Sequence, residues 1–227
     1  MRLRSLLLCF GLLSLTLFTA VPAWCDEKAE RYIKVLGLDA DSLHLEVDGR
    51  KLDIPLPDGY EPMSPEKYPD LYEYLFETSE ESENIPLCFL VNSEENATIQ
   101  DGELVNKIIL IEILYDFIPK RVSEKTFEEE VNTIKSNHEE FKEWKKLAKR
   151  PDYSSYYIYE DSTSIARINI EDEVSSDRKY RIGYSRAWIL IEDIVISISF
   201  YEDIYTDDNI HSLKKTTLSY IRKLGKE

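Results

Sequence analysis

The chain has 227 residues and a formal net charge of −16, with 28 Lys and Arg residues against 44 Asp and Glu residues. Such acidity argues against binding to DNA, RNA or anionic lipid, because each of these needs clustered cations on the protein. Three cysteines are too few for a disulfide scaffold, and the length suits one domain with a sizeable core.

The first 25 residues have the parts of an export signal. Arg2 and Arg4 precede an apolar run over 6–20, and small residues flank a cleavage site after it. The run of about 15 residues is shorter than the roughly 20 that span a bilayer. We expect cleavage after Cys25, with cleavage after Ala23 and an uncleaved anchor as the alternatives.

Removal of this signal leaves residues 26–227 as one acidic α+β domain. The signal holds two basic residues and no acids, so the formal charge of the remainder is −18. We find no internal repeat and no linker long enough to divide two domains. No membrane span remains after cleavage, and the sequence predicts a periplasmic or secreted protein.

The first half of the domain is predicted to begin with a hairpin and a helix. Apolar and polar residues alternate in two runs, and Asp48-Gly49 between them is a strong signal for a two-residue turn. Pro65 lies in the first turn of a helix expected over 64–78, and an acidic, Ser-rich loop follows at 77–83. The strands expected in this half are 43–47, 52–56, 85–91 and 107–118.

The second half is predicted to begin with a long helix over 123–149. Apolar residues recur there at steps of three and four, and acids crowd its start and cations its end, as the helix macrodipole favours. Hairpin strands follow, with Glu192-Asp193 as the turn of the last pair. A final helix over 207–224 carries an apolar stripe, and Gly225 suits its C-terminal cap. The strands expected in this half are 153–159, 164–170, 180–191 and 194–201.

The order of these elements indicates the fold class. The strands come in hairpins and do not alternate singly with helices, which favours an antiparallel sheet over a doubly wound one. We therefore predict a single α+β domain, in which an antiparallel β-sheet built from hairpins is covered by about three helices.

No motif in the sequence predicts catalysis, and we assign no catalytic, cofactor-binding or metal residue and no cofactor. Residues 183–187 (Gly-Tyr-Ser-Arg-Ala) look like a nucleophile elbow, but a strand follows them where that motif needs a helix. His44, His138 and His211 share no ligand spacing. Cys88 lies in an apolar run and is expected to be a buried, inert thiol.

Several stretches resemble parts of exported bacterial proteins of unknown function. They are 52–60 (LDIPLPDGY) with the helix that contains Tyr72, the apolar strand at 87–91, and 188–201 with the amphipathic helix after it. The order of elements over 43–224 also resembles the Mog1/PsbP-like α/β/α sandwich. This resemblance implies no catalytic residue and no activity.

The sequence is therefore interpreted as a non-enzymatic binding or accessory module of the cell envelope. One alternative is a hydrolase that acts through carboxylates, because 44 acids offer many pairs. Another is a secreted effector or inhibitor. Two buried acids that face each other in a cleft would favour the hydrolase, whereas acids confined to solvated loops would favour the module.

The acidic loops are the candidate partner-binding surface. Acids cluster at 77–83, 94–95 and 171–173, all in predicted loops, where binding surfaces commonly lie. We single out Glu80, Glu81 and Glu83. Their partner is expected to be a basic protein or envelope component and not a nucleic acid, and the alternative is that the charge serves solubility alone.

Overall fold

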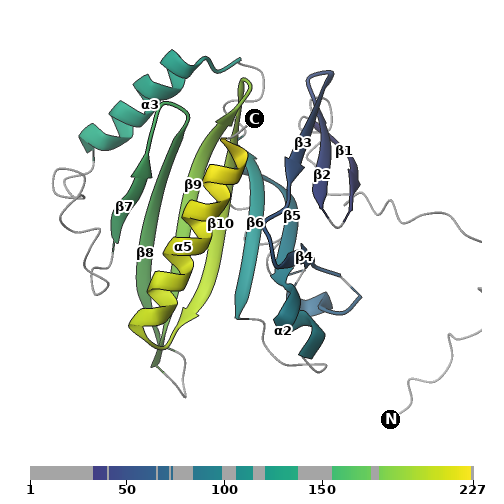
Figure 1. The fold of residues 1–227 in the computed structure, drawn as a ribbon, viewed down its shortest axis with the longest axis vertical. Coiled ribbons are helices and arrows are strands. Elements are labelled where there is room, and N and C mark those ends of the chain that lie inside the picture. Colours follow the sequence, from purple (N-terminus) through teal and green to yellow (C-terminus); the bar gives the residue numbers. More distant parts are fainter. Residues whose placement is uncertain are drawn as a thin grey trace, which may run out of the picture.

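The computed structural model describes residues 33–39, 41–64, 66–71, 73, 84–98, 106–114, 121–137, 155–174 and 179–225. The strands in this part of the chain are β1 (Ile33–Leu38), β2 (Ser42–Val47), β3 (Arg50–Pro55), β4 (Tyr60–Pro62), β5 (Asn84–Asn92), β6 (Lys107–Leu114), β7 (Ser155–Glu160), β8 (Ser164–Val174), β9 (Lys179–Ile191) and β10 (Ile194–Ile204). The helices are α2 (Ser93–Thr98), α3 (Glu124–Asn137) and α5 (Asp207–Leu224). Figure 1 shows their arrangement.

The strands form two antiparallel sheets. The small sheet has the order β1-β2-β3, and the large sheet has the order β4-β5-β6-β10-β9-β8-β7. All the pairs in both sheets are antiparallel, and most neighbours are hairpins. The predicted α+β class with a hairpin-built antiparallel sheet is confirmed. The predicted turn at Asp48-Gly49 joins β2 to β3, and both of its residues have positive φ angles.

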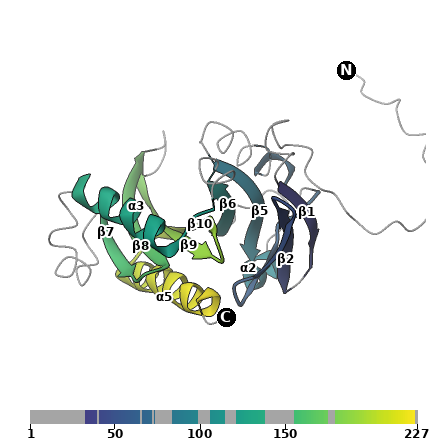
Figure 2. The same cartoon turned by 90° about the horizontal axis from the view of Figure 1, so that it is seen from above.

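One face of the large sheet holds the main core. The small sheet and α5 both pack there, and Figure 2 shows them next to each other. Leu43, Leu45 and Ile54 of the small sheet lie in the same apolar cluster as the inward side chains of α5. Residues of α5 that recur at steps of three and four are buried, as an amphipathic helix requires: Ile210, Leu213, Thr217, Tyr220, Ile221 and Leu224.

Two smaller apolar clusters occupy the opposite face of the large sheet. Phe127 and Val131 of α3 pack at one end against Tyr157 and other buried residues. Met63 and Tyr68 pack at the other end against β5 and β6. The side chains of β6 to β10 between these two clusters are largely polar, so this face has an apolar cover at both ends and a polar middle.

The large sheet is irregular at its β4 end, where β5 pairs with only a short outer strand. β4 pairs only with the end of β5, from Leu90 to Asn92. On its other side β5 pairs with β6, and the register shifts between Pro86 and Cys88. A proline without a backbone N–H fits such an irregular position.

Several predicted boundaries differ from the observed ones. In the helix predicted at 64–78, Ser64 forms a turn, 69–71 and 73 are helical, and 65, 72 and 74–78 lie outside the described residues. Pro69 suits the first helical position. The helix predicted over 123–149 is α3 up to Asn137, and 138–149 lie outside the described residues. The final helix at 207–224 is confirmed. The strands β1 and β4 and the helix α2 were not predicted.

The predicted loop placement of two acidic clusters is wrong. Residues 94–95 lie in α2, where the side chain of Asn92 accepts a hydrogen bond from the N–H of Glu95 at 3.1 Å and so caps the helix. Residues 171–173 lie in β8, which continues to pair with β9 as far as Val174. Helix capping and the long β8–β9 ladder therefore turn both segments into regular structure.

Gly183 lies where β9 comes closest to β10 and α5. A Cβ atom on Gly183 would lie 2.7 Å from Cδ1 and 2.8 Å from Cγ1 of Ile204, and 3.0 Å from Cδ2 of Leu213. We expect Gly183→Ala to lower the free energy of unfolding by about 1–3 kcal/mol through overpacking, as measured by urea denaturation. Gly37→Ala is the control, since its Cβ would meet only His44 at 3.8 Å. Equal midpoints for the two variants would contradict this packing.

Candidate functional site

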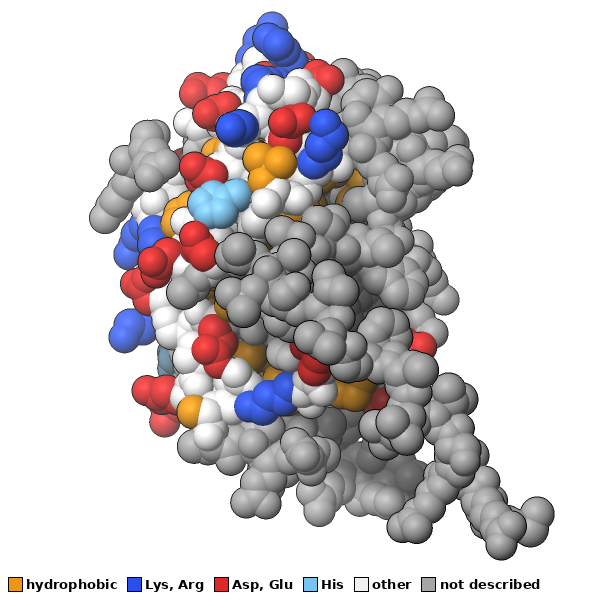
Figure 3. Space-filling view, turned by 90° about the vertical axis from the view of Figure 1, so that its right-hand side faces the viewer, with side chains coloured by type: hydrophobic (Ala, Val, Ile, Leu, Met, Phe, Trp, Pro, Cys, Tyr) orange, Lys and Arg blue, Asp and Glu red, His pale blue; other side chains and the backbone are white. Residues whose placement is uncertain are grey.

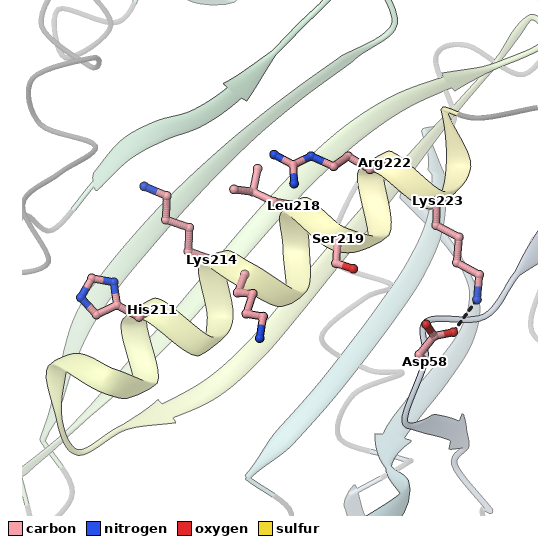
Figure 4. A pocket seen from close by; sticks show the side chains of 8 residues that line it. Asp58, His211, Lys214, Leu218, Ser219, Arg222 and Lys223 are labelled. Carbon is pink, nitrogen blue, oxygen red and sulfur yellow. Dashed lines mark hydrogen bonds and ion pairs between the residues drawn. The ribbon is translucent and has the colours of Figure 1, made fainter.

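The outer face of α5 gathers positive charge on an acidic protein. The inward side of the helix is apolar, and the four cations Lys214, Lys215, Arg222 and Lys223 lie on the other side. Together with Asp58 they line an open hollow of about 720 Å³ (Figure 4). The helix residues that line it are His211, Lys214, Lys215, Leu218, Ser219, Arg222 and Lys223.

The cations of this hollow differ in how they are held. The Nζ atom of Lys223 donates hydrogen bonds to the carbonyl of Leu56 at 2.9 Å and to Oδ1 of Asp58 at 2.7 Å. The Nζ atom of Lys214 lies 6.0 Å from the ring centroid of Tyr156, and burial lowers the pKa of this lysine. Figure 4 shows Lys214 and Arg222 on one side of α5 and Lys223 on the other.

This arrangement can hold an acidic segment. Among the described residues, no carboxylate forms an ion pair with Lys215 or Arg222. Leu218 is half-buried at the centre of the hollow and adds an apolar contact. Part of the basic charge also serves the helix itself, because cations in the last turn of a helix complement its macrodipole.

The side of the molecule that carries the small sheet has a different charge pattern. Figure 3 shows acidic and basic side chains interspersed there. In the strands, Lys34 pairs with Glu46 at 3.1 Å. The charges of Lys34 and Glu46 neutralise each other locally.

The acidic residues singled out from the sequence lie outside the described part of the chain. Glu80, Glu81 and Glu83 fall there, so their role stays a prediction. In the second acidic cluster, Oε2 of Glu95 accepts hydrogen bonds from the N–H groups of Asn106 and Lys107, each at 3.1 Å. Glu95 therefore fastens the start of β6.

His44 lies between two carboxylates on the small sheet. Its Nδ1 is 2.7 Å from Oδ1 of Asp53, and its Nε2 is 3.0 Å from Oδ2 of Asp39. These hydrogen bonds raise the pKa of His44, and the bond to His44 with two backbone N–H groups lowers the pKa of Asp39 to about 2. Both ring nitrogens are occupied, so this histidine cannot accept a proton from a nucleophile. His138 lies outside the described residues.

The elbow-like segment is a strand, as expected from the residues that follow it. Gly183 and Ser185 lie within β9. The side chain of Ser185 is fully buried, and its hydroxyl is hydrogen-bonded to Thr217 of α5. This serine therefore joins a strand to a helix and is closed to a substrate.

The buried carboxylates of the described chain do not face each other. Glu112 is 2% exposed and lies on the α3 side of the large sheet, where its Oε2 accepts a hydrogen bond from Ser197 at 3.4 Å. Glu202 is 5% exposed and lies on the α5 side, opposite Lys107. Burial raises the pKa of Glu202. With a sheet between them, these two acids cannot act together on one bond.

No group of three or more His, Cys, Asp or Glu side chains in the described ranges is arranged to hold a metal ion. Within the same ranges, the helices are too short or too polar to cross a lipid bilayer.

The apolar stripe and the C-terminal cap of α5 were predicted from the sequence, but its cations were not predicted to be functional. The signal was present, because basic residues recur on the other side of the same helix from Lys214 to Lys223. Asp58, which completes the hollow, lies far away in the sequence. Its position depends on how the small sheet docks beside α5.

No family model matches the chain, and no curated protein is significantly similar to it in sequence. The solved structure of the Ran-binding protein Mog1p from Saccharomyces cerevisiae aligns with 76% of this chain and 87% of that chain, at 13% identity and a TM-score of 0.34. A likeness of this size carries no argument, so the similarity to Mog1/PsbP-like sandwiches stays a resemblance.

The sequence expectation for Cys88 leads to a test of thiol reactivity. Its side chain is buried, and burial raises its thiol pKa to about 12. In a protein that begins at Asp26, Cys88 is the only cysteine. We expect this thiol to stay unreacted with a thiol reagent in the native state and to react fully in denaturant. Ser219→Cys, which adds an exposed thiol, should label rapidly. Equal native labelling rates for the two thiols would contradict the burial of Cys88.

Proposed function

We propose that the protein is a non-enzymatic binding module of the cell envelope that recognises an acidic partner through the outer face of α5. The observation that carries this proposal is the hollow lined by His211, Lys214, Lys215, Arg222 and Lys223 in a chain of net charge −16. A local field of the opposite sign guides an acidic partner to this face and orients it there.

The overall negative charge adds selectivity to this recognition. An acidic partner is repelled by most of an acidic surface, so productive encounters are confined to the basic face. Exposed charges contribute mainly to the rate and specificity of association, whereas the half-buried Leu218 adds apolar contact area. The binding should therefore be weak at high salt and strongly dependent on the sign of the partner's charge.

The buried carboxylates support binding over hydrolysis. Glu112 and Glu202 lie on opposite faces of the large sheet, which does not suit the paired acids of a carboxylate-dependent hydrolase. Ser185 is buried against Thr217. The second candidate function is recognition of a basic partner through the acidic residues Glu80, Glu81 and Glu83.

A peptide-binding experiment separates an acidic partner from a basic one. We expect a fluorescent oligo-glutamate peptide to bind the wild type, with an affinity that falls as salt rises from about 0.05 M to about 0.5 M because of screening. The variant with Lys214, Lys215 and Arg222 changed to Gln should lose about tenfold in affinity, measured by fluorescence anisotropy. Each exposed cation contributes only part of this loss.

The matched control removes three charges of the other sign. With Glu80, Glu81 and Glu83 changed to Gln, binding of oligo-glutamate should be unchanged or stronger. If the wild type binds oligo-lysine and this control variant does not, the acidic residues Glu80, Glu81 and Glu83 would be supported as the interface. Equal oligo-glutamate affinity for the wild type and the α5 variant would rule out the outer face of α5.

Export is part of the same proposal, and the mass of the protein tests it. The motivation is the charged start, the apolar run over 6–20 and the small residues before Asp26. Expressed in its own host, the protein should lose its first 25 residues, or its first 23 as the second choice. Intact mass spectrometry of the envelope fraction measures this. A full-length species in the membrane would instead indicate an uncleaved anchor.

A further inference from the structure

The polar middle of the large sheet, on the face opposite α5, contains two adjacent arginines. Arg167 of β8 and Arg186 of β9 are register partners in the antiparallel ladder. Both side chains are half-buried. Directly opposed residues have Cβ atoms about 5 Å apart, and like charges at this spacing destabilise a sheet. An arginine pair at this position therefore needs a compensating interaction.

Among the described residues, hydrogen bonds engage one nitrogen of each guanidinium. The Nε atom of Arg167 donates to Oγ of Ser155 at 2.9 Å and to Oδ1 of Asn169 at 2.8 Å. The Nε atom of Arg186 donates to Oγ of Ser199 at 3.1 Å. These bonds orient the two planar groups, and among the described residues the terminal amino groups of both arginines remain available as donors.

Among the carboxylates whose side chains the structure describes, none forms an ion pair with Arg167 or Arg186. The buried acid of this face, Glu112, lies on β6, which is two strands away from β9 in the order β6-β10-β9. Its register partner on β10 is Ser197, whereas Arg186 is opposite Ser199. Glu112 therefore lies in the next row of the sheet, and Arg167 and Arg186 form no ion pair with it.

We propose that Arg167 and Arg186 form an anion site that binds a phosphate group. Two guanidinium forks present parallel donors, which suit the oxygens of phosphate, and a dianion balances two positive charges. A carboxylate carries a single charge and would leave one cation uncompensated. The chemistry is the same for inorganic phosphate and for a phosphate monoester, and the hydroxyl of Ser199 lies in the same row of the sheet.

This site is independent of the partner surface on α5. The side chains of Ala187 and Ile189 in β9 join the core beside α5, whereas Arg186 alternates with them and lies on the other face. A ligand at the arginine pair is thus separated from the hollow by the sheet. Its binding can be measured while the outer face of α5 is altered.

Thermal unfolding and calorimetry with inorganic phosphate test the site. We expect phosphate to raise the melting temperature of the wild type above the value in sodium chloride of equal ionic strength. Arg167→Gln and Arg186→Gln should each lower the phosphate affinity about tenfold or more. Arg167→Lys keeps the charge but loses the planar guanidinium, so its phosphate affinity should lie between those of the wild type and Arg167→Gln. Arg121→Gln removes an exposed arginine that belongs to neither proposed site, and it should leave the phosphate affinity unchanged within about twofold.

The melting temperatures without phosphate show whether the variants still fold. Without phosphate, Arg186→Gln should melt at the wild-type temperature or above it, because the substitution removes repulsion between like charges. Phenyl phosphate tests for a monoester, and tighter binding than inorganic phosphate would assign the site to esters. The proposal is overturned if phosphate acts only as sodium chloride does, if the glutamine variants keep the wild-type affinity, or if acetate binds as tightly as phosphate.

Discussion

The pairing of β6 with β10 is the interaction on which the rest of the structure depends. It aligns Ile111 with Ile198 and joins two segments that lie far apart in the chain. Without it, β4-β5-β6 and β7-β8-β9-β10 would be separate small sheets. Because both strands are central, their side chains are buried on both faces, and this explains why β6 reads as an apolar run interrupted only by Glu112 after its first residue. The ladder also places α5 beside the small sheet.

The two candidate sites follow from the two faces of this central sheet. On one face, α5 and the small sheet complete the core, and the helix leaves its basic side to solvent. On the other face, α3 and the segment around Tyr68 cover the two ends, and in the described part of the chain Arg167 and Arg186 are half-buried in the middle. In each case a cation cluster occurs where apolar packing stops. Negative charge elsewhere in the chain makes these clusters electrostatically distinct.

The spacing of apolar residues and the turn residues predicted most of the helices and strands, because these elements are determined largely by local sequence. The turn at Glu192-Asp193 sets the β9–β10 register, so counting outward from it places Arg186 opposite Ser199. The position of Arg167 could not be obtained in this way, because the register of β8 depends on the long ladder with β9. β1 was missed because its apolar and polar residues alternate weakly, with Gly37 at an irregularity in the pairing. The basic face of α5 was predictable from helical spacing, whereas its hollow needed Asp58 from the turn between β3 and β4.

The short pairing of β4 has a consequence for self-association. β4 pairs with β5 only from Leu90 to Asn92. In the described chain, the preceding residues of β5 therefore form an edge of the large sheet. An open strand this rich in aliphatic residues is a template for edge-to-edge aggregation. Pro86 cannot donate a backbone hydrogen bond to an incoming strand, and the shift beside Cys88 disturbs the regular spacing that such a strand would need. The same residues that make β5 irregular therefore hinder the addition of another strand at this edge.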